Sequence, residues 1–382
     1  MGCHPRVMHV LSGLTGGGAE TNTVRLSNAL ADRGWDQIVV TLTPEIDPHL
    51  RSLLRVPLYY PPQARRFVGG AAILADNIRD FQPSVIHGRA YRTWAECITA
   101  RITTNCDAKL VQSFHGATSL DIQVIRRRVM AWFMHGLTDA FAAVSHDLAR
   151  RMTEQWQISA ERIQVIPNGV DVDRFHPPTC REEAKRGLGI DSDAFAVGSV
   201  GSLREVKNQG MLLRAFAGFA AAGGSNVLLL VGDGPMRGDL ESLARDLGIG
   251  DQVMFCGRQG EVARYLSAMD VFVQPSLKEG SPTAVLEAMA CGIPTVAVRS
   301  TGCAELHEQI EQPLLVDPDD IESLQELLSD LADNADRRRE LGEGGWQAVI
   351  HKFSFERMVE AYEDLYRRTA AAEVGQPLCV RS

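Results

Sequence analysis

The chain has 382 residues, of which 45% are hydrophobic, and a net charge of −9 at neutral pH. This length predicts two domains, and the acidic balance argues against a general nucleic-acid-binding protein. The sequence has no apolar run of about 18 residues, the length of a membrane span, and it begins without the apolar stretch of a signal peptide. We therefore expect a cytoplasmic protein.

Eight cysteines are scattered along the chain, without a Cys-x-x-Cys pair or a His/Cys cluster at zinc spacing. The serine-elbow, Walker-loop and His-Glu-x-x-His motifs are also absent from the sequence. Hydrolase, kinase and zinc-protease functions therefore have little support.

Short apolar runs alternate with helix-length segments through the first half of the chain. The runs RVMHVLS, QIVVTLT, SVIHG, KLVQSFHG, AFAAVS and RIQVIPNG are typical of buried strands, and helices are expected at about residues 19–33 and 70–81. This alternation predicts a parallel sheet with helices on both faces. In such open sheets, ligands bind at the carboxyl ends of the strands.

A glycine-rich loop, SGLTGGGAETN, follows the first strand and opens the first helix. Gly17 and Gly18 would let a ligand approach the backbone closely, while amides at the helix start face an anion. A glycine loop here also suits a dinucleotide enzyme, although the Gly-x-Gly-x-x-Gly spacing is missing. His115, in SFHG, stands at another strand end, where a lone histidine is more often structural than catalytic.

The segment VIRRRVMAWFMHG combines Arg126, Arg127 and Arg128 with Trp132 and Phe133. Such a basic and aromatic mixture can dock a peripheral protein on an anionic membrane. The alternative is a helix of the first domain with Trp132 in the core and the arginines in water.

The strand pattern is interrupted between about residues 168 and 190, where Pro, Gly and charged residues replace periodic apolar ones. It resumes with AFAVGSVG, NVLLLVGDG, QVMFCG, DVFVQPS and PTVAVRS, which predicts a second parallel sheet. The segment FSFERMVEAYEDLYRRTAA closes the chain as a long helix.

Loops at the strand ends of the second half carry cations and glycines. GSLREVKNQG places Arg204 and Lys207 after Gly201 and before a helix, and two cations beside helix-start amides suit a diphosphate. Solvated loop charges are the alternative. VGDGP, with Gly234, and FCGR, with Arg258, are suited to lining a nucleobase and ribose pocket.

The stretch KEGSPTAVLEAMACGIP contains a carboxylate in an apolar setting. A helix is expected over residues 282–291, with Ser281 as its cap and Gly292 at its end, and Glu287 is its only charge. A buried carboxylate needs a hydrogen-bond donor. Glu287 should therefore bond a ligand, unless it forms a structural salt bridge or lies on a solvated stripe.

A second carboxylate, Glu279, stands eight positions before Glu287 in the loop that leads into this helix. The two can grip different parts of one extended ligand, with the amides of Thr283 and Ala284 facing an anion between them. A sugar, a diphosphate and a ribose would fit that order.

Together these motifs resemble the retaining glycosyltransferases of family 4, which have the GT-B fold. The likeness covers nearly the whole chain and rests on GGGAE, SFHG, AVSHDL, VIPNGVDVDRFHP, GSLREVKN, VGDGP and EGSPTAVLEAMACGIPTVA. It implies an α/β fold with two Rossmann-like domains whose parallel sheets face each other across a cleft. The acceptor-binding domain would span residues 1–170 and the nucleotide-sugar-binding domain 171–352, with a C-terminal helix and tail, 353–382, crossing back to the first domain.

The resemblance also implies roles for single residues. Arg204 and Lys207 would contact the donor diphosphate, Glu287 the ribose hydroxyls and Glu279 the donor sugar, while His115 would lie near the reacting sugar. The expected catalytic residues are His115, Arg204, Lys207 and Glu279. The expected donor-binding residues are Gly17, Gly18, Gly201, Arg204, Lys207, Gly234, Arg258, Glu279, Gly280, Ser281, Thr283, Ala284 and Glu287. The segment STGCAELHEQIEQPLLVDPDD lacks the glycine-rich form and the Asn-Gly turn common in the family, so this side of the donor pocket is expected to differ.

The implied activity is retaining, metal-independent transfer of a sugar from a nucleotide-diphosphate donor, a UDP- or GDP-sugar, to a saccharide or lipid-linked saccharide acceptor in bacterial polysaccharide or glycolipid synthesis. No metal, no separate cofactor and no nucleic acid are expected. The enzyme would act in the cytoplasm, at the inner face of the membrane if the basic segment binds lipid. The alternatives are a nucleotide-sugar epimerase of the same fold, a sucrose-phosphate or sucrose synthase within the family, and a non-catalytic nucleotide-sugar-binding subunit.

Overall fold

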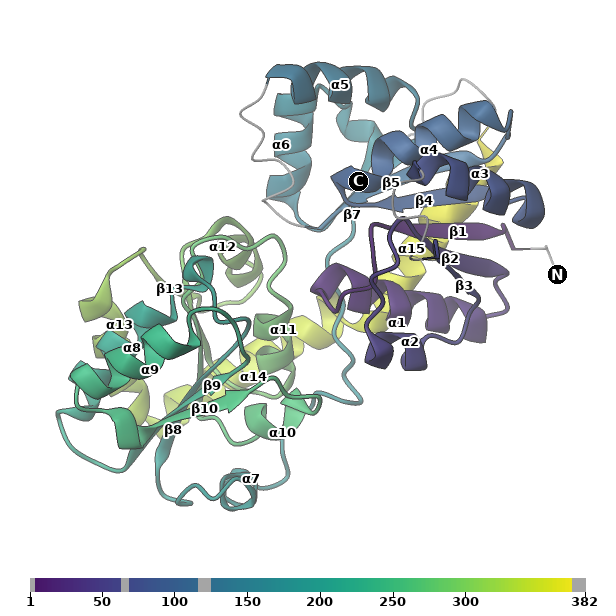
Figure 1. The fold of residues 1–382 in the computed structure, drawn as a ribbon. Coiled ribbons are helices and arrows are strands. Elements are labelled where there is room, and N and C mark those ends of the chain that lie inside the picture. The colour runs from purple at the N-terminus through teal and green to yellow at the C-terminus, as the bar shows by residue number, and fades with distance from the viewer. Residues whose placement is uncertain (1–3, 63–68, 116–124, 373–382) are drawn as a thin grey trace. The chain divides into compact units, whose positions relative to one another are not determined.

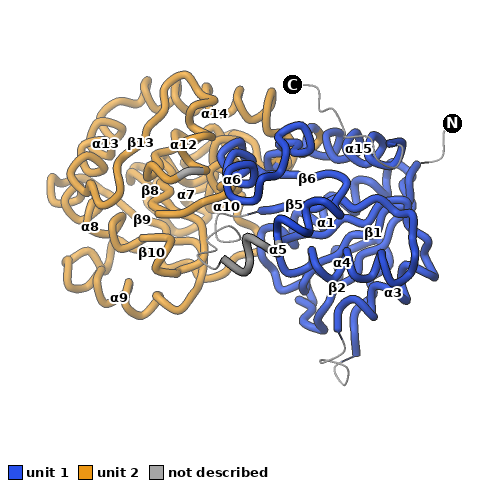
Figure 2. Tube along the Cα trace, turned by 90° about the horizontal axis from the view of Figure 1, so that it is seen from above, with its two compact units in different colours: residues 1–168, 357–382 blue, residues 169–356 orange. Residues whose placement is uncertain are grey.

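The computed structural model describes residues 4–62, 69–115 and 125–372, and within the last range the side chains of residues 125–130 and of Thr301 are not described. The chain divides into two compact units, shown in blue and orange in Figure 2. Unit 1 consists of residues 1–168 and 357–382, and unit 2 of residues 169–356. Each unit is built around one sheet whose strands pair in parallel (Figure 1).

Within its described residues, unit 1 has a seven-stranded sheet in the order β3-β2-β1-β4-β5-β6-β7. The strands are β1 (Val7–Leu11), β2 (Gln37–Thr41), β3 (Leu58–Tyr59), β4 (Val85–Arg89), β5 (Lys109–Phe114), β6 (Ala140–Ala143) and β7 (Ile163–Val165). The helices are α1 (Gly18–Asp32), α2 (Pro48–Leu53), α3 (Gly70–Phe81), α4 (Tyr91–Thr103), α5 (Ile125–Gly136), α6 (His146–Trp156), the short 3₁₀ turn η3 (Ala160–Arg162) and, from the end of the chain, α15 (Phe355–Ala371).

The described part of unit 2 has a six-stranded sheet in the order β10-β9-β8-β11-β12-β13. The strands are β8 (Phe195–Val200), β9 (Asn226–Val231), β10 (Val253–Gly257), β11 (Val271–Gln274), β12 (Thr295–Val298) and β13 (Leu314–Val316). The helices are α7 (Arg181–Gly187), α8 (Gln209–Ala220), α9 (Arg237–Asp246), α10 (Val262–Leu266), α11 (Thr283–Ala290), α12 (Thr301–His307), α13 (Ile321–Asp333) and α14 (Ala335–Lys352), with 3₁₀ turns η4 (Glu205–Lys207) and η5 (Gly250–Gln252).

Both sheets are doubly wound, because the strand order reverses direction between β1 and β4 in unit 1 and between β8 and β11 in unit 2. At such a switch point the loops leave neighbouring strands in opposite directions, and the crevice between their carboxyl ends is where open α/β sheets bind ligands. The prediction of an α/β fold with two Rossmann-like parallel sheets is therefore confirmed. Each sheet also defines where its own candidate site should lie.

The two faces of the unit 1 sheet differ in polarity. Met8 and Val10 of β1 and Ile86 of β4 belong to an apolar core that also contains Trp94 of α4. Because side chains alternate along a strand, the opposite face carries the polar residues of the same strands, including His9, which is fully buried. Parallel strands covered on both faces are normally apolar throughout, so this buried polar face is unusual.

The C-terminal helix α15 returns to unit 1 and covers this polar face. Its Tyr366 hydroxyl lies 2.6 Å from His87 Nδ1, and its Glu363 accepts hydrogen bonds from Trp35 Nε1 and Arg33 Nη1, both at 2.6 Å. Both tyrosines of the helix, Tyr362 and Tyr366, are buried. Unit 1 is thus completed by residues from the far end of the sequence, as the blue α15 in Figure 2 shows.

In the part of the chain that the structure describes, no helix combines the length and the apolar composition needed to cross a membrane.

Candidate active site

The switch point of unit 2 brings together the two loops that the sequence singled out. β8 and β11 are neighbours in the sheet, and the loop after each begins at its carboxyl end. The backbone amide of Leu277 in the second loop donates to the carbonyl of Val206 in the first, with an N–O distance of 3.0 Å. This hydrogen bond connects the two loops at the switch point, where the strand order of the sheet reverses.

Lys207 and Glu279 form an ion pair at this point. Lys207 Nζ lies 2.6 Å from Glu279 Oε1, and the two side chains are 24% and 13% exposed. Gln274, the last residue of β11, donates from Nε2 to the same carboxylate oxygen at 2.6 Å and to Ser276 Oγ at 2.8 Å. The ammonium group has three donors, so two remain for phosphate oxygens after the bond to Glu279.

Arg204 is exposed at the start of η4 and supplies a second cation to the same loop. Among the residues that the structure describes, no hydrogen-bond or ion-pair partner is found for its guanidinium group. The helix expected after this loop is α8, which begins at Gln209, because the one-turn η4 holds Lys207 and Asn208 then turns with φ 51°. Lys207 is held by an ion pair and Arg204 is exposed, and both cations stand beside a helix start, as a diphosphate site requires.

The predicted glycines Gly201 and Gly234 lie where two neighbouring loops pack closely. The Gly201 amide donates to the Val231 carbonyl at 2.9 Å. A Cβ at position 234 would come within 2.3 Å of the Leu203 carbonyl oxygen, so no larger residue fits without displacing the loop that carries Arg204. Gly234 therefore shapes the cation loop through backbone packing.

Helix α11, which carries Glu287, begins one residue later than predicted. Pro282, and not the predicted Ser281, is the N-cap residue of α11, so the predicted N-cap position is off by one residue. Gly292 ends the helix in the left-handed conformation with φ 63°, as its position suggested. The helix thus ends at its glycine, and its start is shifted by one residue from the prediction.

Glu287 lies on the one face of α11 that is not fully buried. Thr283 and Ala284, one turn before it, are half-buried like Glu287, whereas the residues on the other faces are buried. Burial and, second, the Glu287 carboxylate raise the pKa of the neighbouring Cys291 thiol to about 12. This face therefore reaches the surface from Thr283 to Glu287, in the half of the helix nearer Glu279.

Gly280 is held from the other side by the start of α12. The Gly302 amide donates to the Glu279 carbonyl at 3.2 Å, and a Cβ on Gly302 would come within 2.7 Å of the Gly280 carbonyl oxygen. The segment that begins STGCAELH departs from the family pattern, but its Gly302 stands at a contact where a side chain would not fit.

Arg258 is exposed immediately after β10, the edge strand of the sheet, and β9 and β8 lie between β10 and the β11 loop.

In the glycine-rich loop of unit 1, the Gly17 amide is already bonded to a side chain of the helix that follows, α1. Glu20 Oε2 accepts from the Gly17 amide at 2.6 Å and from the Thr15 amide at 3.1 Å, which is one half of a capping box at the start of α1, since Gly17 has no side chain to supply the other half. Gly17 and Gly18 are exposed, and Gly16 has φ 97°. An anion that uses the Gly17 amide must therefore displace the Glu20 carboxylate.

His115 lies at the carboxyl end of β5 in unit 1. Its Nε2 is 2.8 Å from Ser113 Oγ, while its Nδ1 is buried and has no partner within the described residues. Burial and, second, the Arg89 charge lower the pKa of His115 to about 3. The imidazole is therefore neutral at physiological pH and can serve as a hydrogen-bonding group.

Two site residues escaped the sequence interpretation. Gln274 lies within the apolar run DVFVQPS, and Arg89 directly follows the predicted strand SVIHG. The sequence did contain an indication of both residues. Strands of a parallel sheet are normally apolar on both faces, and a buried polar side chain near their carboxyl end destabilises the fold unless it forms hydrogen bonds.

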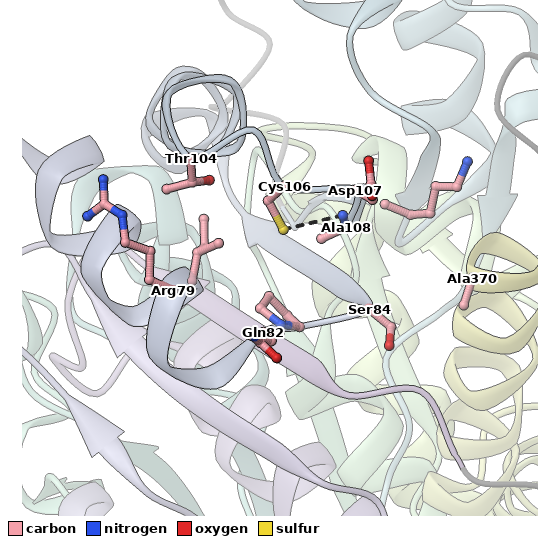
Figure 3. Close-up of a pocket in the computed structure, with 11 residues that line it drawn as sticks. Arg79, Gln82, Ser84, Thr104, Cys106, Asp107, Ala108 and Ala370 are labelled. Carbon is pink, nitrogen blue, oxygen red and sulfur yellow. Dashed lines mark hydrogen bonds between the residues drawn. The ribbon is translucent and has the colours of Figure 1, made fainter.

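A pocket of about 550 Å³ opens in unit 1 at the amino ends of β4 and β5, at the end of the sheet opposite to Arg89 and His115. Figure 3 shows Ser84 and Ala108 on the strand side, Arg79 and Thr104 on the helix side, and the Ala108 amide donating to Cys106 Sγ at 3.4 Å. It is distant from the switch-point end of the sheet, and its lining does not match any predicted role.

Comparison with known proteins agrees with this geometry. Residues 16–174 match the model of Glycosyltransferase Family 4, and residues 180–347 match the model of Glycosyl transferases group 1. The chain is 30% identical over 312 residues to the putative glycosyltransferase EpsF of Bacillus subtilis (strain 168), which covers 76% of this chain and 78% of that protein. It is also 30% identical over 380 residues to the lipopolysaccharide core biosynthesis glycosyltransferase LpsD of Rhizobium meliloti (strain 1021), which covers 96% and 99% of the two chains.

Among solved structures, Anabaena Alr3699/HepE in complex with UDP and glucose matches with a TM-score of 0.80 at 19% identity, over 95% of this chain and 100% of that chain. At this identity the likeness concerns the fold, which is the GT-B arrangement of two Rossmann-like domains. The two family models, the relatives and the fold lead to one conclusion: the chain is a glycosyltransferase and belongs to family 4.

Proposed function

We propose that this glycosyltransferase moves a sugar from a nucleotide-diphosphate donor, a UDP- or GDP-sugar, to an acceptor hydroxyl, with retention of anomeric configuration and without a metal ion. The observation that carries the proposal is the joining of Arg204, Lys207 and Glu279 at the switch point of unit 2. HepE, which shares the fold, was crystallised with UDP and glucose, and this supports a nucleotide donor.

The charges at the site suit the bond that must break. When the bond between the anomeric carbon and the diphosphate oxygen breaks, the leaving diphosphate gains negative charge, and the Lys207 ammonium and Arg204 guanidinium groups can stabilise it. Glu279, fixed by Lys207 and Gln274, would hold hydroxyls of the donor sugar. The acceptor hydroxyl attacks the same face of the sugar, and its proton passes to an oxygen of the leaving phosphate.

The donor is tested by adding UDP, GDP, ADP and their sugars to the purified chain and measuring the melting temperature, since a ligand of the native state raises it by mass action. Only one base is expected to give a large rise, and activity should persist in EDTA. An NMR spectrum of the product that shows an inverted anomer would contradict retention. Conversion of the donor without any acceptor would favour the epimerase alternative, and binding without turnover would favour a non-catalytic subunit.

We expect Glu287→Gln to weaken nucleotide binding by about 10-fold to 150-fold, because hydrogen bonds to a charged group contribute about 1.5 to 3 kcal/mol. The half-buried position of Glu287 on α11 allows it to reach ribose hydroxyls. Calorimetric titration with the nucleotide measures the effect, and Glu322→Gln, an exposed change on α13, is the control. Unchanged affinity together with a lower melting temperature would assign Glu287 a structural role instead.

The relatives EpsF and LpsD carry the names of a putative glycosyltransferase and a lipopolysaccharide core enzyme, and on this basis we place the chain in bacterial polysaccharide or glycolipid synthesis in the cytoplasm. The acceptor would then be a saccharide or a lipid-linked saccharide, and contact with the membrane becomes relevant.

Helix α5 exposes the aromatic residues that a membrane contact needs. Trp132 is 52% exposed, Phe133 63% and Leu137 43%, and the two aromatic rings lie 4.9 Å apart. The interpretation that places Trp132 in the core is therefore wrong. The side chains of Arg126, Arg127 and Arg128 lie outside the described residues, but the helix continues through them, one to two turns before the aromatic pair.

We propose that α5 binds the anionic inner face of the membrane, where about 1 kcal/mol per surface arginine and the inserted aromatic rings would hold it. The chain should sediment with phosphatidylglycerol vesicles at low salt and be released as salt rises. Replacement of all three arginines by Gln should abolish sedimentation and leave nucleotide affinity intact. Absence of binding to these vesicles at low salt, or equal binding to neutral vesicles, would contradict the proposal.

A further inference from the structure

Arg89, the last residue of β4, is a buried cation for which the described residues provide no counter-ion. Its side chain is 2% exposed, and Nε and Nη2 have no hydrogen-bond partner among the described residues. Its guanidinium carbon lies 5.2 Å from the ring centre of Tyr362, and it also bonds the Tyr366 hydroxyl. The Tyr362 ring faces the guanidinium group without neutralising its charge.

The groups around Arg89 are neutral. His9, His87 and His115 each have a lowered pKa, caused first by burial and next by the charge of Arg89. Glu363, on the same helix as the two tyrosines, is already bonded to Arg33 and Trp35. A buried cation in such surroundings is costly unless an anion joins it.

The position of Arg89 indicates where that anion would come from. β4 and β1 are the two strands at the switch point of unit 1, and Arg89 stands at the carboxyl end, where open sheets of this kind bind ligands. The register pairs Arg89 with Ser113 of β5, so His115, two residues on, lies on the same face. His115 Nδ1 is a second buried polar atom there without a partner in the described chain.

We infer that Arg89 and His115 bind an anionic group, a phosphate or a carboxylate, of the acceptor. The inference rests on the proposed function, because it assigns the substrate class of the glycosyltransferase. Arg89 offers Nε and Nη2 as a planar pair of donors, which matches two oxygens of either anion. If Ser113 donates its hydroxyl proton to His115 Nε2, the imidazole carries its proton on Nδ1 and donates it to the same anion.

The test uses the full chain saturated with UDP, so that the cations of unit 2 are already engaged. Inorganic phosphate and, in a separate titration, acetate are added, and binding is measured by calorimetry. We expect one site, with the better of the two probes identifying the anion. Arg89→Gln should weaken binding at least 10-fold, Arg89→Lys should retain part of it, and Arg79→Gln, an exposed arginine on α3, should leave it unchanged.

If Arg89→Gln does not fold, His115→Asn and the wild-type titration still decide the matter. Failure of the wild type to bind either probe, or equal affinity in wild type and the variants, would overturn the inference. Failure of UDP to bind would count against a UDP-sugar donor alone, because the difference between wild type and Arg89→Gln can then be measured with phosphate in the absence of nucleotide.

Discussion

Lys207→Ala is expected to lower turnover by about 100-fold to 1,000-fold, the scale reported for the loss of one preorganised group that stabilises developing charge. Lys207 supplies a partly shielded cation at the switch point of unit 2, and its pairing with Glu279 fixes both side chains before the donor arrives. Steady-state kinetics with the donor found in the nucleotide screen measures the effect. Arg204→Ala should fall in the same range, because its exposed guanidinium group is the second cation of the loop.

The matched control is Arg214→Ala, which removes an exposed cation from α8 of the same unit and should leave turnover unchanged. Since Lys207 also holds Glu279, the double variant Lys207→Ala/Glu279→Gln should lose less than the product of the two single losses. Turnover near that of the wild type in Lys207→Ala or Arg204→Ala would remove the diphosphate assignment for that residue.

Unit 1 should lose stability as the pH falls from 7 to 5. His9 and His87 are fully buried, and their pKa values are lowered by burial and by the Arg89 charge, that of His9 to about 3. Below the unfolded value of about 6.5, the unfolded chain takes up protons that the folded chain cannot, so the free energy of unfolding decreases by about 1.4 kcal/mol per pH unit for each histidine. At pH 5 the loss is about 2 kcal/mol per histidine, and for His9 it continues down to about pH 3.

Denaturant unfolding followed by tryptophan fluorescence measures this loss, because four of the five tryptophans belong to unit 1. His9→Gln removes one titrating group and should reduce the slope of stability against pH, whatever its effect at pH 7. His49→Gln, at an exposed position, is the control. The same slope in His9→Gln and wild type would show that the buried histidine does not govern acid sensitivity.

The sequence predicted the fold well because the information is local. Apolar runs of strand length alternate with helical segments, and the helix expected at 70–81 is α3. Glycine at 292 and proline at 282 limited α11 to within one residue of the prediction. The N-cap of α11 is Pro282 and not Ser281, because the start of a helix depends on the path of the preceding loop, and that path is set by contacts with distant residues such as Gly302.

The residues of the candidate site were predicted from the sequence, but the ion pair between Lys207 and Glu279 was not. Loop position and charge were enough to select Arg204, Lys207 and Glu279, whereas the direct ion pair depends on the pairing of β8 with β11. Arg89 was missed for the same reason, because its surroundings among the described residues follow from the register of β4 and β5 and from the return of α15. No segment of sequence contains that information.

The return of α15 also affects how the protein is made. Residues 169–356 separate the sheet of unit 1 from the tyrosines that cover it, and at about 5 to 20 residues per second the ribosome needs about 10 to 40 s to synthesise them. During that time Trp35 and His87 lack the partners supplied by Glu363 and Tyr366. Unit 2 is complete before unit 1, so synthesis order and folding order are reversed, and residues 1–168 expressed alone would lack the helix that closes their polar face.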